Sequence, residues 1–163
     1  MEAILGILSD THGLVRPEVH SALENCELII HAGDIGNARV LSELERIAPV
    51  VAIRGNIDQG AWAERIPTFE FIEHRGRFIY VLHNLNELDI DPVAAGIDAV
   101  ISGHSHQPKN EKKDGVLYFN PGSAGPRRFK LPIGLGKIYL GRDGSLSAQW
   151  IDLETRPGTS PKA

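Results

Sequence analysis

The sequence predicts an α/β fold with two β-sheets and helices on their outer faces. In the first third, three apolar runs alternate with two segments of helical spacing, and this order favours a parallel sheet that is buried on both faces. Beyond residue 67, most apolar runs come in pairs separated by short turn sequences, which favours a second sheet that is mixed or antiparallel. The 163 residues correspond to about one domain.

The first elements are defined by apolar spacing and by helix-start signals. Pro17 suits the first turn of a helix. Apolar residues at positions 40, 41, 44 and 47 recur at helical intervals. The expected elements are strands at Ala3–Ser9, Leu28–His31 and Val50–Ile53, and helices at Pro17–Asn25 and Asn37–Ile47.

The later elements are separated by Gly-containing turns, of which Asp114-Gly115 is the strongest hairpin signal. The expected elements are strand pairs at Thr68–His74 with Arg77–His83, Gln107–Lys113 with Val116–Asn120, and Ile133–Leu140 with Ser145–Ile151, a strand at Ala99–Ser102, and a short helix at Pro92–Gly96. Residues 1–154 are expected to form one domain, and the polar residues 155–163 a disordered tail.

Charge and composition restrict the class of protein. A net charge of −4 argues against a general nucleic-acid binder, so nucleic acid is expected only as a nucleotide-type substrate. Cys26 is the one cysteine, which excludes an intrachain disulfide and favours a reducing, cytoplasmic setting. We expect no signal peptide, since a strand-like run begins at Ala3, and no membrane partner, since no apolar run approaches a bilayer span. Homo-oligomer formation stays open.

Polar side chains follow five of the expected strands. In open α/β sheets, ligands bind beyond the carboxyl ends of the strands, so these residues are expected to converge although they are distant in sequence. The motifs are Asp10-Thr11-His12, Gly33-Asp34, Gly55-Asn56, His83, and Gly103-His104-Ser105-His106.

These residue types indicate a metal site without thiolate ligands. Carboxylate and amide oxygens with imidazole nitrogens suit Mn²⁺, which we expect first, or Ni²⁺, Fe²⁺ or Zn²⁺. Two Asp, one Asn and four His exceed the ligands that one ion needs, so two divalent ions are expected. Asp34 is the candidate bridge between them, because Gly33 leaves room for close approach.

Each of these residues also has an ordinary structural explanation. An Asp or Asn at a strand end is usually a turn former, and Asp10 or Asn37 could cap a helix. Coincidence at five strand ends is far less plausible than a site. His20 and His74 lie away from strand ends and are read as structural, whereas His31 fits either a partner of the metal ligands or a simple strand position. The lysines at 109, 112 and 113 are expected on an exposed edge.

Together the five motifs resemble those of the calcineurin-like metallophosphoesterases, from Ala3 to about Arg128. The short chain and the Asn120-Pro121-Gly122-Ser123 segment resemble the small prokaryotic phosphodiesterase branch, to which the retromer scaffold subunit is also similar. The resemblance implies a four-layer αββα sandwich of two mixed sheets flanked by helices. It also implies two ligand sets, namely Asp10, His12, Asp34 and His106 for the first ion, and Asp34, Asn56, His83 and His104 for the second.

Two positions depart from the family pattern. Many phosphatases of the family have a histidine after the Gly-Asn motif that protonates the leaving group, and here that residue is Ile57. No general acid is identified, and Asp58 is as consistent with orienting a neighbour as with acid catalysis. After His83 the small branch often has glycine, where Asn84 could narrow the pocket or contact substrate.

The sequence therefore predicts a hydrolase that cleaves phosphodiester bonds of small substrates by attack of a hydroxide activated by two metal ions, with phosphomonoester hydrolysis as the near alternative. Asp34, Asn56 and His83 are expected to act catalytically through the metal centre, and Arg127 and Arg128 to clamp the substrate phosphate or to be a solvated pair. The alternatives are an inactive protein-interaction scaffold of the same fold and a nuclease. Filled ligand positions argue against the scaffold, and the acidic balance argues against the nuclease.

Overall fold

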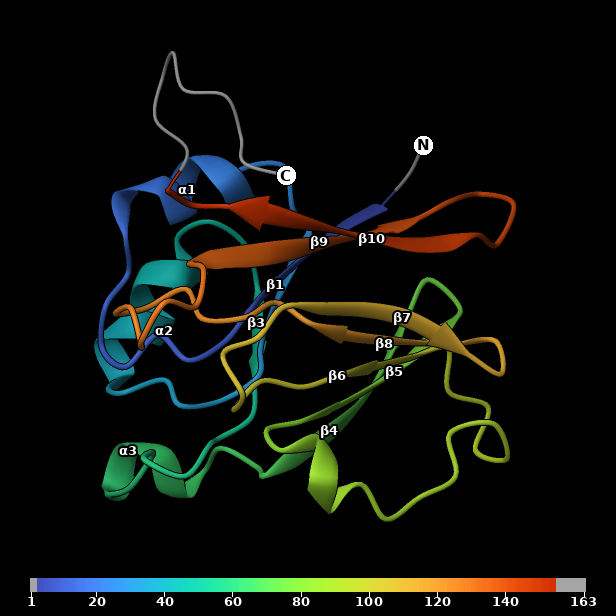
Figure 1. Cartoon of the computed structure of the whole chain (residues 1–163), viewed down its shortest axis with the longest axis horizontal. Coiled ribbons are helices and arrows are strands. Elements are labelled where there is room, and N and C mark those ends of the chain that lie inside the picture. Colours follow the sequence, from blue (N-terminus) through green and yellow to red (C-terminus); the bar gives the residue numbers. More distant parts are fainter. Residues whose placement is uncertain (1–2, 155–163) are drawn as a thin grey trace.

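Two five-stranded sheets packed face to face form the molecule in a computed structural model that describes residues 3–154 (Figure 1). The predicted tail at 155–163 lies outside the described residues. The first sheet contains β1 (Ala3–Leu8), β2 (Leu28–His31), β3 (Val50–Ala52), β9 (Gly134–Leu140) and β10 (Leu146–Asp152). The second contains β4 (Phe69–His74), β5 (Arg77–Leu82), β6 (Ala99–Ile101), β7 (Lys109–Lys113) and β8 (Val116–Asn120).

Four helical segments connect these strands. They are α1 (Pro17–Leu23), α2 (Ala38–Glu45), α3 (Ala61–Glu64) and the 3₁₀-helix η1 (Leu85–Glu87). Pro17 stands in the first turn of α1, and the side chain of Asn37 caps α2 by accepting the Val40 N–H at 3.3 Å. The predicted strands and the two longer helices are confirmed with ends shifted by one or two residues. No helix within residues 3–154 has the length and apolar character needed to cross a membrane.

Both sheets are mixed, as the family resemblance implies. The strand order is β10-β9-β1-β2-β3 in the first sheet and β4-β5-β6-β8-β7 in the second. In the first sheet β1, β2 and β3 pair in parallel, but β9 and β10 add two antiparallel pairings at the other side of β1. The parallel pairing that the alternation of elements predicts is therefore confirmed for β1, β2 and β3, but the sheet as a whole is not mostly parallel, because the C-terminal hairpin joins it.

The main core lies between the two sheets. Leu5, Ile7 and Ile30 of the first sheet and Ile79 and Phe119 of the second are among its fully buried side chains. Alternation along each strand sends every second residue into this layer and fixes the register of the pairing. Because the two sheets share one core, the strand ends of one sheet are held firmly against those of the other.

The outer faces of the sheets are covered in different ways. Val19 and Leu23 of α1 and Val40 and Leu44 of α2 pack over the first sheet. The outer face of the second sheet is covered by the loop after β5 and its 3₁₀-helix, through residues such as Leu85. The expected helix at Pro92–Gly96 is wrong, since this segment is a series of turns. Five residues that end at Gly96, with φ 73°, are too short to make a stable helix.

The edge strand β7 agrees with its interpretation from sequence. All five of its residues are exposed, including the lysines at 109, 112 and 113. Lys109 pairs with Glu111 at 3.6 Å, and β7 lies at the end of the second sheet. Charged side chains on an exposed edge discourage pairing with another chain.

A surface ion-pair cluster joins the two sheets and gives a prediction for stability. The Glu27 carboxylate, next to β2, accepts from Arg75 Nε at 2.6 Å and meets His74 Nε2 at 2.6 Å in the β4–β5 turn. The hydrogen bond from Arg75, with that from His74, lowers the pKa of Glu27 from 4.5 to about 2.

Because the pKa of Glu27 is lower in the folded state, its stabilising contribution is complete above pH 4.5 and disappears as the pH falls toward 2. We expect Glu27→Gln to lower the free energy of unfolding at pH 7 by up to about 1 kcal/mol, the range of exposed pairs in water. Urea titrations of both proteins at pH 7 and pH 3 measure this, and the difference should shrink at pH 3. An equal difference at both values would contradict the ion-pair contribution.

Candidate metal centre

Five loops that follow β1, β2, β3, β5 and β6 converge at one edge of the sandwich. Backbone hydrogen bonds join them in pairs, from the Asp10 N–H to Gly33 O at 2.9 Å, from the His12 N–H to Asp34 O at 3.0 Å, and from the Gly103 N–H to His83 O at 2.9 Å. The carboxyl ends of parallel strands therefore meet as the sequence predicts. The two sheets contribute to this edge together.

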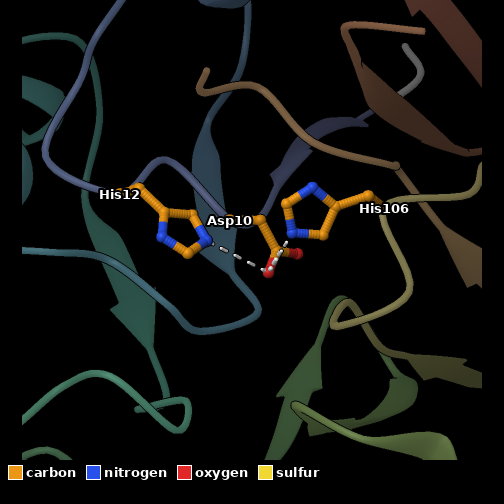
Figure 2. A group of neighbouring side chains, drawn as sticks. All are labelled: Asp10, His12 and His106. Carbon is orange, nitrogen blue, oxygen red and sulfur yellow. Dashed lines mark ion pairs between the residues drawn. The ribbon is translucent and has the colours of Figure 1, made fainter. Parts of the chain in front are cut away.

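Asp10 lies at the centre of the converging loops and is fully buried. Its Oδ2 accepts from Ser9 Oγ at 2.7 Å and from the His104 N–H at 3.1 Å. Its Oδ1 has no hydrogen-bond partner and instead faces the Nε2 atoms of His106 at 3.4 Å and His12 at 3.9 Å. Figure 2 shows both imidazole rings directed at this one oxygen from opposite sides. One oxygen is thus held by the protein, while the other is directed at the histidines.

Asp34 and His83 form the other half of the cluster. Asp34 Oδ2 lies 3.2 Å from His83 Nε2 and 3.7 Å from His12 Nε2, while Oδ1 accepts the Ile57 N–H at 3.2 Å. His83 donates its Nδ1–H to the Ala32 carbonyl at 2.7 Å, which leaves Nε2 directed at the carboxylates. A ligating histidine is commonly fixed by a hydrogen bond from its second nitrogen in this way.

The charges of the cluster are set by its burial and its contacts. Burial acts to raise the pKa of Asp34, but the neighbouring imidazole of His83 and the Ile57 N–H lower it to about 2. Burial acts to lower the pKa of His83, but Asp34, the Ala32 carbonyl and the charge of Asp10 raise it above its usual value. Asp34 is accordingly ionised over the whole physiological range.

His104 and Asn56 lie at the rim of the cluster. Both are exposed, and the His104 ring packs edge-on against His83 with ring centroids 5.2 Å apart. Asn56 follows β3 and lines the same hollow as His83. The structure therefore brings Asp10, His12, Asp34, His83 and His106 together in two groups that share Asp10, and places Asn56 and His104 beside them.

The backbone at the cluster is unusual. Eight non-glycine residues within 3–154 have positive φ, and five of them are predicted ligands, namely Asp10, His12, Asp34, His104 and His106. This left-handed region is sparsely populated by non-glycine residues, among which Asn, Asp and His are the most frequent. Strained backbone persists where the surrounding structure imposes it, and it concentrates at functional sites.

Glycines before two of the ligands allow the loops to approach closely. A Cβ at Gly55 would overlap Oδ1 of Asp34, and Gly33 has a φ of 100° with a Cβ position 2.7 Å from His83 Nδ1. The close approach that the sequence predicts at Gly33 is therefore observed. The backbone of the loop after β3 and the ring of His83 fill the space that a side chain would take. No side chain other than hydrogen fits at either position.

Two buried side chains hold the ligand loops together from behind. Asp58 accepts three backbone N–H groups, those of Ile35 at 3.0 Å, Gly36 at 2.9 Å and Gly55 at 2.8 Å. It thereby ties the Asp34 loop to the Asn56 loop, so of its two interpretations from sequence the orienting one agrees with these contacts.

His31 connects the Asp34 loop with the Asp10 loop. Its Nδ1 accepts the Gly33 N–H at 3.1 Å, so its proton resides on Nε2, which donates to Thr11 Oγ1 at 3.0 Å. Burial lowers the pKa of His31 to about 4 and keeps this imidazole neutral. Its place behind the ligand loops favours the interpretation as a partner of the metal ligands.

Sequence reasoning missed the supporting role of the loop after β8. Ser123 Oγ donates to the Asp10 carbonyl at 3.1 Å, and Asn120 Nδ2 donates to the Gly103 carbonyl at 3.0 Å. The available signal was that Asn120 ends an apolar run, as the ligands do. The Asn-Pro-Gly-Ser segment thus supports the loops of Asp10 and His104 at once.

The residues present fit a divalent cation. Four buried polar atoms lack a hydrogen-bond partner among the described residues, and all four belong to predicted ligands, namely Asp10 Oδ1, His12 Nε2, His83 Nε2 and His106 Nδ1. Two groups have the mutual spacing of metal ligands, Asp10 with His12 and His106, and Asp10 with Asp34 and His83. Buried polar atoms without partners are costly unless an ion or water satisfies them.

The two groups share Asp10, whereas the predicted bridge is Asp34. Asp34 Oδ2 nevertheless lies between His12 and His83, which the family resemblance assigns to different ions. The bridging role of Asp34 stays a prediction. His20 pairs with Glu43 at 3.5 Å and His74 with Glu27, so both lie outside the cluster.

The two predicted arginine clamps differ in their surroundings. Arg127 is engaged by Glu154 and donates to the Leu131 carbonyl at 3.0 Å. Arg128 is exposed; its carbonyl accepts the Leu131 N–H at 3.1 Å, but its guanidinium has no hydrogen bond within residues 3–154. Both line a small pocket that also includes His12 and His106.

The chain belongs to the calcineurin-like phosphoesterase superfamily. The model of this superfamily's domain matches residues 4–140, which include all seven predicted ligands. The fold of two mixed sheets and the residues at the strand ends agree with this membership. Membership in this family, with relatives named as phosphoesterases, supports a hydrolase that uses divalent metal ions.

Archaeal relatives place the chain near the small prokaryotic branch. It is 37% identical to a probable metallophosphoesterase of Methanothermobacter thermautotrophicus, over 74% of this chain and 76% of the relative. It is 31% identical to a phosphodiesterase of Methanocaldococcus jannaschii, over 72% of this chain and 82% of that protein. The structure of vacuolar protein sorting 29 from Cryptosporidium parvum matches 93% of this chain and 97% of its own length, with a TM-score of 0.74 and 15% identity.

The contacts of Asp58 give a prediction for stability. Asp58→Ala removes the acceptor of three backbone N–H groups, and we expect the free energy of unfolding to fall by about 2–3 kcal/mol. Asp58→Asn keeps one side-chain oxygen and should lose less. Thermal unfolding of the three proteins tests the order, and an unchanged Tm in Asp58→Ala would contradict the role of this side chain as a loop tie.

Proposed function

We propose that this protein is a phosphodiesterase for small substrates that uses two divalent ions, with Mn²⁺ as the first candidate. The observation that supports this most is the set of unpartnered buried atoms of Asp10, His12, His83 and His106, which come from loops of both sheets. Their donor types suit Mn²⁺, Ni²⁺, Fe²⁺ or Zn²⁺. The similarity to the Methanocaldococcus jannaschii phosphodiesterase supports the diester preference.

Asp10, His12, Asp34 and His106 would hold one ion, and Asp34, Asn56, His83 and His104 the other. Such ions supply positive charge for phosphate oxygens and lower the pKa of a water molecule. The chain's own contribution is to fix the ligands in advance. Ser9 and the His104 N–H hold Asp10, the Ile57 N–H holds Asp34, and the Ala32 carbonyl holds His83.

Asp34, Asn56 and His83 are the residues that we assign to catalysis through the metal centre. His83 and Asn56 line the hollow next to the cluster. A phosphate bound by the ions would lie close to both side chains. No side chain is assigned as general acid, because Ile57 replaces the histidine of other family members and Asp58 is bound to three backbone N–H groups. A diester with a good leaving group needs such an acid least.

Arg128 is the better candidate for a substrate contact of the two arginines. It lines the pocket beside His12 and His106, and its guanidinium has no partner among the described residues. Arg127 lines the same pocket but is held by Glu154 and the Leu131 carbonyl. A guanidinium can bind two phosphate oxygens in one plane.

A protein-interaction scaffold is the alternative function. The similarity in fold to vacuolar protein sorting 29 is consistent with it, although 15% identity concerns the fold alone. Against it, all seven predicted ligand positions are filled by Asp, Asn or His, and five of these residues lie in the two groups with the spacing of metal ligands. Hydrolysis of bis-p-nitrophenyl phosphate in the presence of divalent ions separates the two functions.

The proposed function predicts the behaviour of Asp34→Asn. Wild-type protein should hydrolyse bis-p-nitrophenyl phosphate in Mn²⁺ faster than p-nitrophenyl phosphate, and chelation should abolish the activity. Asp34→Asn should lose at least about 100-fold in kcat, because an amide neutralises less charge on an ion than a carboxylate does. Circular dichroism should show an intact fold, and the exposed Asp143→Asn variant serves as control. Wild-type turnover in Asp34→Asn would exclude Asp34 from the metal centre.

Arg128→Ala tests the phosphate contact. We expect KM for bis-p-nitrophenyl phosphate to rise about tenfold with a smaller change in kcat, since a charge-assisted hydrogen bond is worth roughly 1.5–3 kcal/mol. Arg127→Ala should affect KM less and stability more, because Arg127 pairs with Glu154. Steady-state kinetics of both variants measure the split. Equal, unchanged KM values would show that both arginines are a solvated pair.

A further inference from the structure

A groove of about 840 Å³ extends from the metal centre along the outer face of the second sheet. Its lining includes Asn56 and His83, which lie next to the cluster, and Asn84, Glu87 and Asp89 from the loop after β5. Its size lies within the range of small-molecule sites. A substituent of a phosphate held at the metal centre would have room to extend into this groove.

The other side of the groove is aromatic. Phe69 and Phe71, on the outward face of β4, are 56% and 47% exposed, and Tyr80 lies on the neighbouring strand. Phe69 stacks on Tyr80 with ring centroids 5.8 Å apart and an interplanar angle of 27°. Phe69 also pairs in register with Leu82, the residue before His83, so this ring is close to the metal-centre end.

Exposed phenylalanines in a groove next to a polar site favour a flat, apolar ligand. Two large apolar side chains on one face of a strand expose apolar surface that a folded chain usually buries. Such a patch is typical of a binding site. The aromatic residues line the same groove as Asn56 and His83. A ring bound there can therefore belong to the same molecule as a phosphate at the metal centre. An aromatic ring of the ligand can stack on such a surface without hydrogen bonds to it.

The charged residues of the groove indicate what the rest of the ligand is like. Glu87 and Asp89 are exposed carboxylates at the loop side, with Arg54 as the basic residue of the lining. Burial raises the pKa of Tyr80, and the negative charge of Asp89, which lines the same groove, raises it further. Two carboxylates repel a second phosphate and accept hydrogen bonds from N–H or O–H groups.

We propose that this groove binds a neutral, aromatic heterocyclic substituent of the phosphodiester, of the nucleoside type, with its ring against Phe69 and Phe71 and its N–H or O–H groups directed at Glu87 and Asp89. The inference rests on the proposed function, because it assigns the substrate class of the same site. It disfavours polynucleotides and polyphosphates, whose next phosphate would face these carboxylates.

Binding of adenosine to the full chain treated with chelator tests the groove without requiring metal or turnover. Titration into ¹⁵N-labelled protein should give saturable shifts of amides around residues 69–71 and 87–89, and ribose should give none. Phe69→Ala should bind adenosine about tenfold more weakly, the effect of losing one base–aromatic contact. Phe69→Leu should also bind weakly, because it keeps apolar bulk but lacks the ring. Phe71→Ala provides a second test should Phe69→Ala fold poorly.

The exposed Phe129→Ala variant, outside the groove lining, should bind adenosine as the wild type does. Adenosine that binds no better than ribose, or equally well to Phe69→Ala and Phe71→Ala, would overturn the inference. Hydrolysis of bis-p-nitrophenyl phosphate in Mn²⁺ is measured in parallel. Hydrolysis without adenosine binding overturns the substrate class alone, whereas adenosine binding without hydrolysis under any divalent ion overturns the proposed function and supports the ligand class.

Discussion

The site depends on a buried carboxylate that the protein does not neutralise. Asp10 is fully buried, and within residues 3–154 no lysine or arginine pairs with it. One oxygen is held by Ser9 and the His104 N–H, and the other faces three imidazoles without a hydrogen bond. A buried charge of this kind is strongly unfavourable unless a cation compensates it. The loops around Asp10 therefore have a physical reason to collect ligands for a metal ion.

The packing of the two sheets determines whether those ligands meet. Asp10, Asp34 and Asn56 follow strands of the first sheet, whereas His83 and the His104–His106 loop follow strands of the second. The shared core of fully buried side chains fixes the distance between these strand ends. Asp58 and His31 then join neighbouring loops of the first sheet, and the loop after β8 joins the two sheets. A change far from the metal centre that shifts one sheet against the other would separate the ligands.

Much of this arrangement could be predicted from local patterns in the sequence. Apolar runs that end in Asp, Asn or His define both the strands and the candidate ligands, because side-chain burial and strand direction are local properties. The pairing of β9 with β1 could not be predicted, since it joins segments more than a hundred residues apart. Nothing in the sequence of the C-terminal hairpin indicates which strand it pairs with. The supporting contacts of Asp58 and Asn120 depend on tertiary geometry in the same way. The turns at Pro92–Gly96 and the four-residue helix α3 are both shorter than the window in which helical spacing can be recognised. The sequence therefore could not tell which of the two is a helix.

The surroundings of the metal centre are asymmetric, and the asymmetry bears on the choice between diesters and monoesters. Beside His12 and His106 lies a small pocket with two arginines, and beside Asn56 and His83 lies a larger groove with aromatic and acidic residues. A monoester has one organic group on its phosphate, so one of these two hollows would hold no part of the substrate. A diester bound at the cluster has two substituents and can place one in each direction. The basic pocket suits a phosphate oxygen or a polar substituent, and the aromatic groove suits a ring. The same asymmetry is difficult to explain for a scaffold, whose partner would bind to the surface without needing ligand atoms buried between the two hollows.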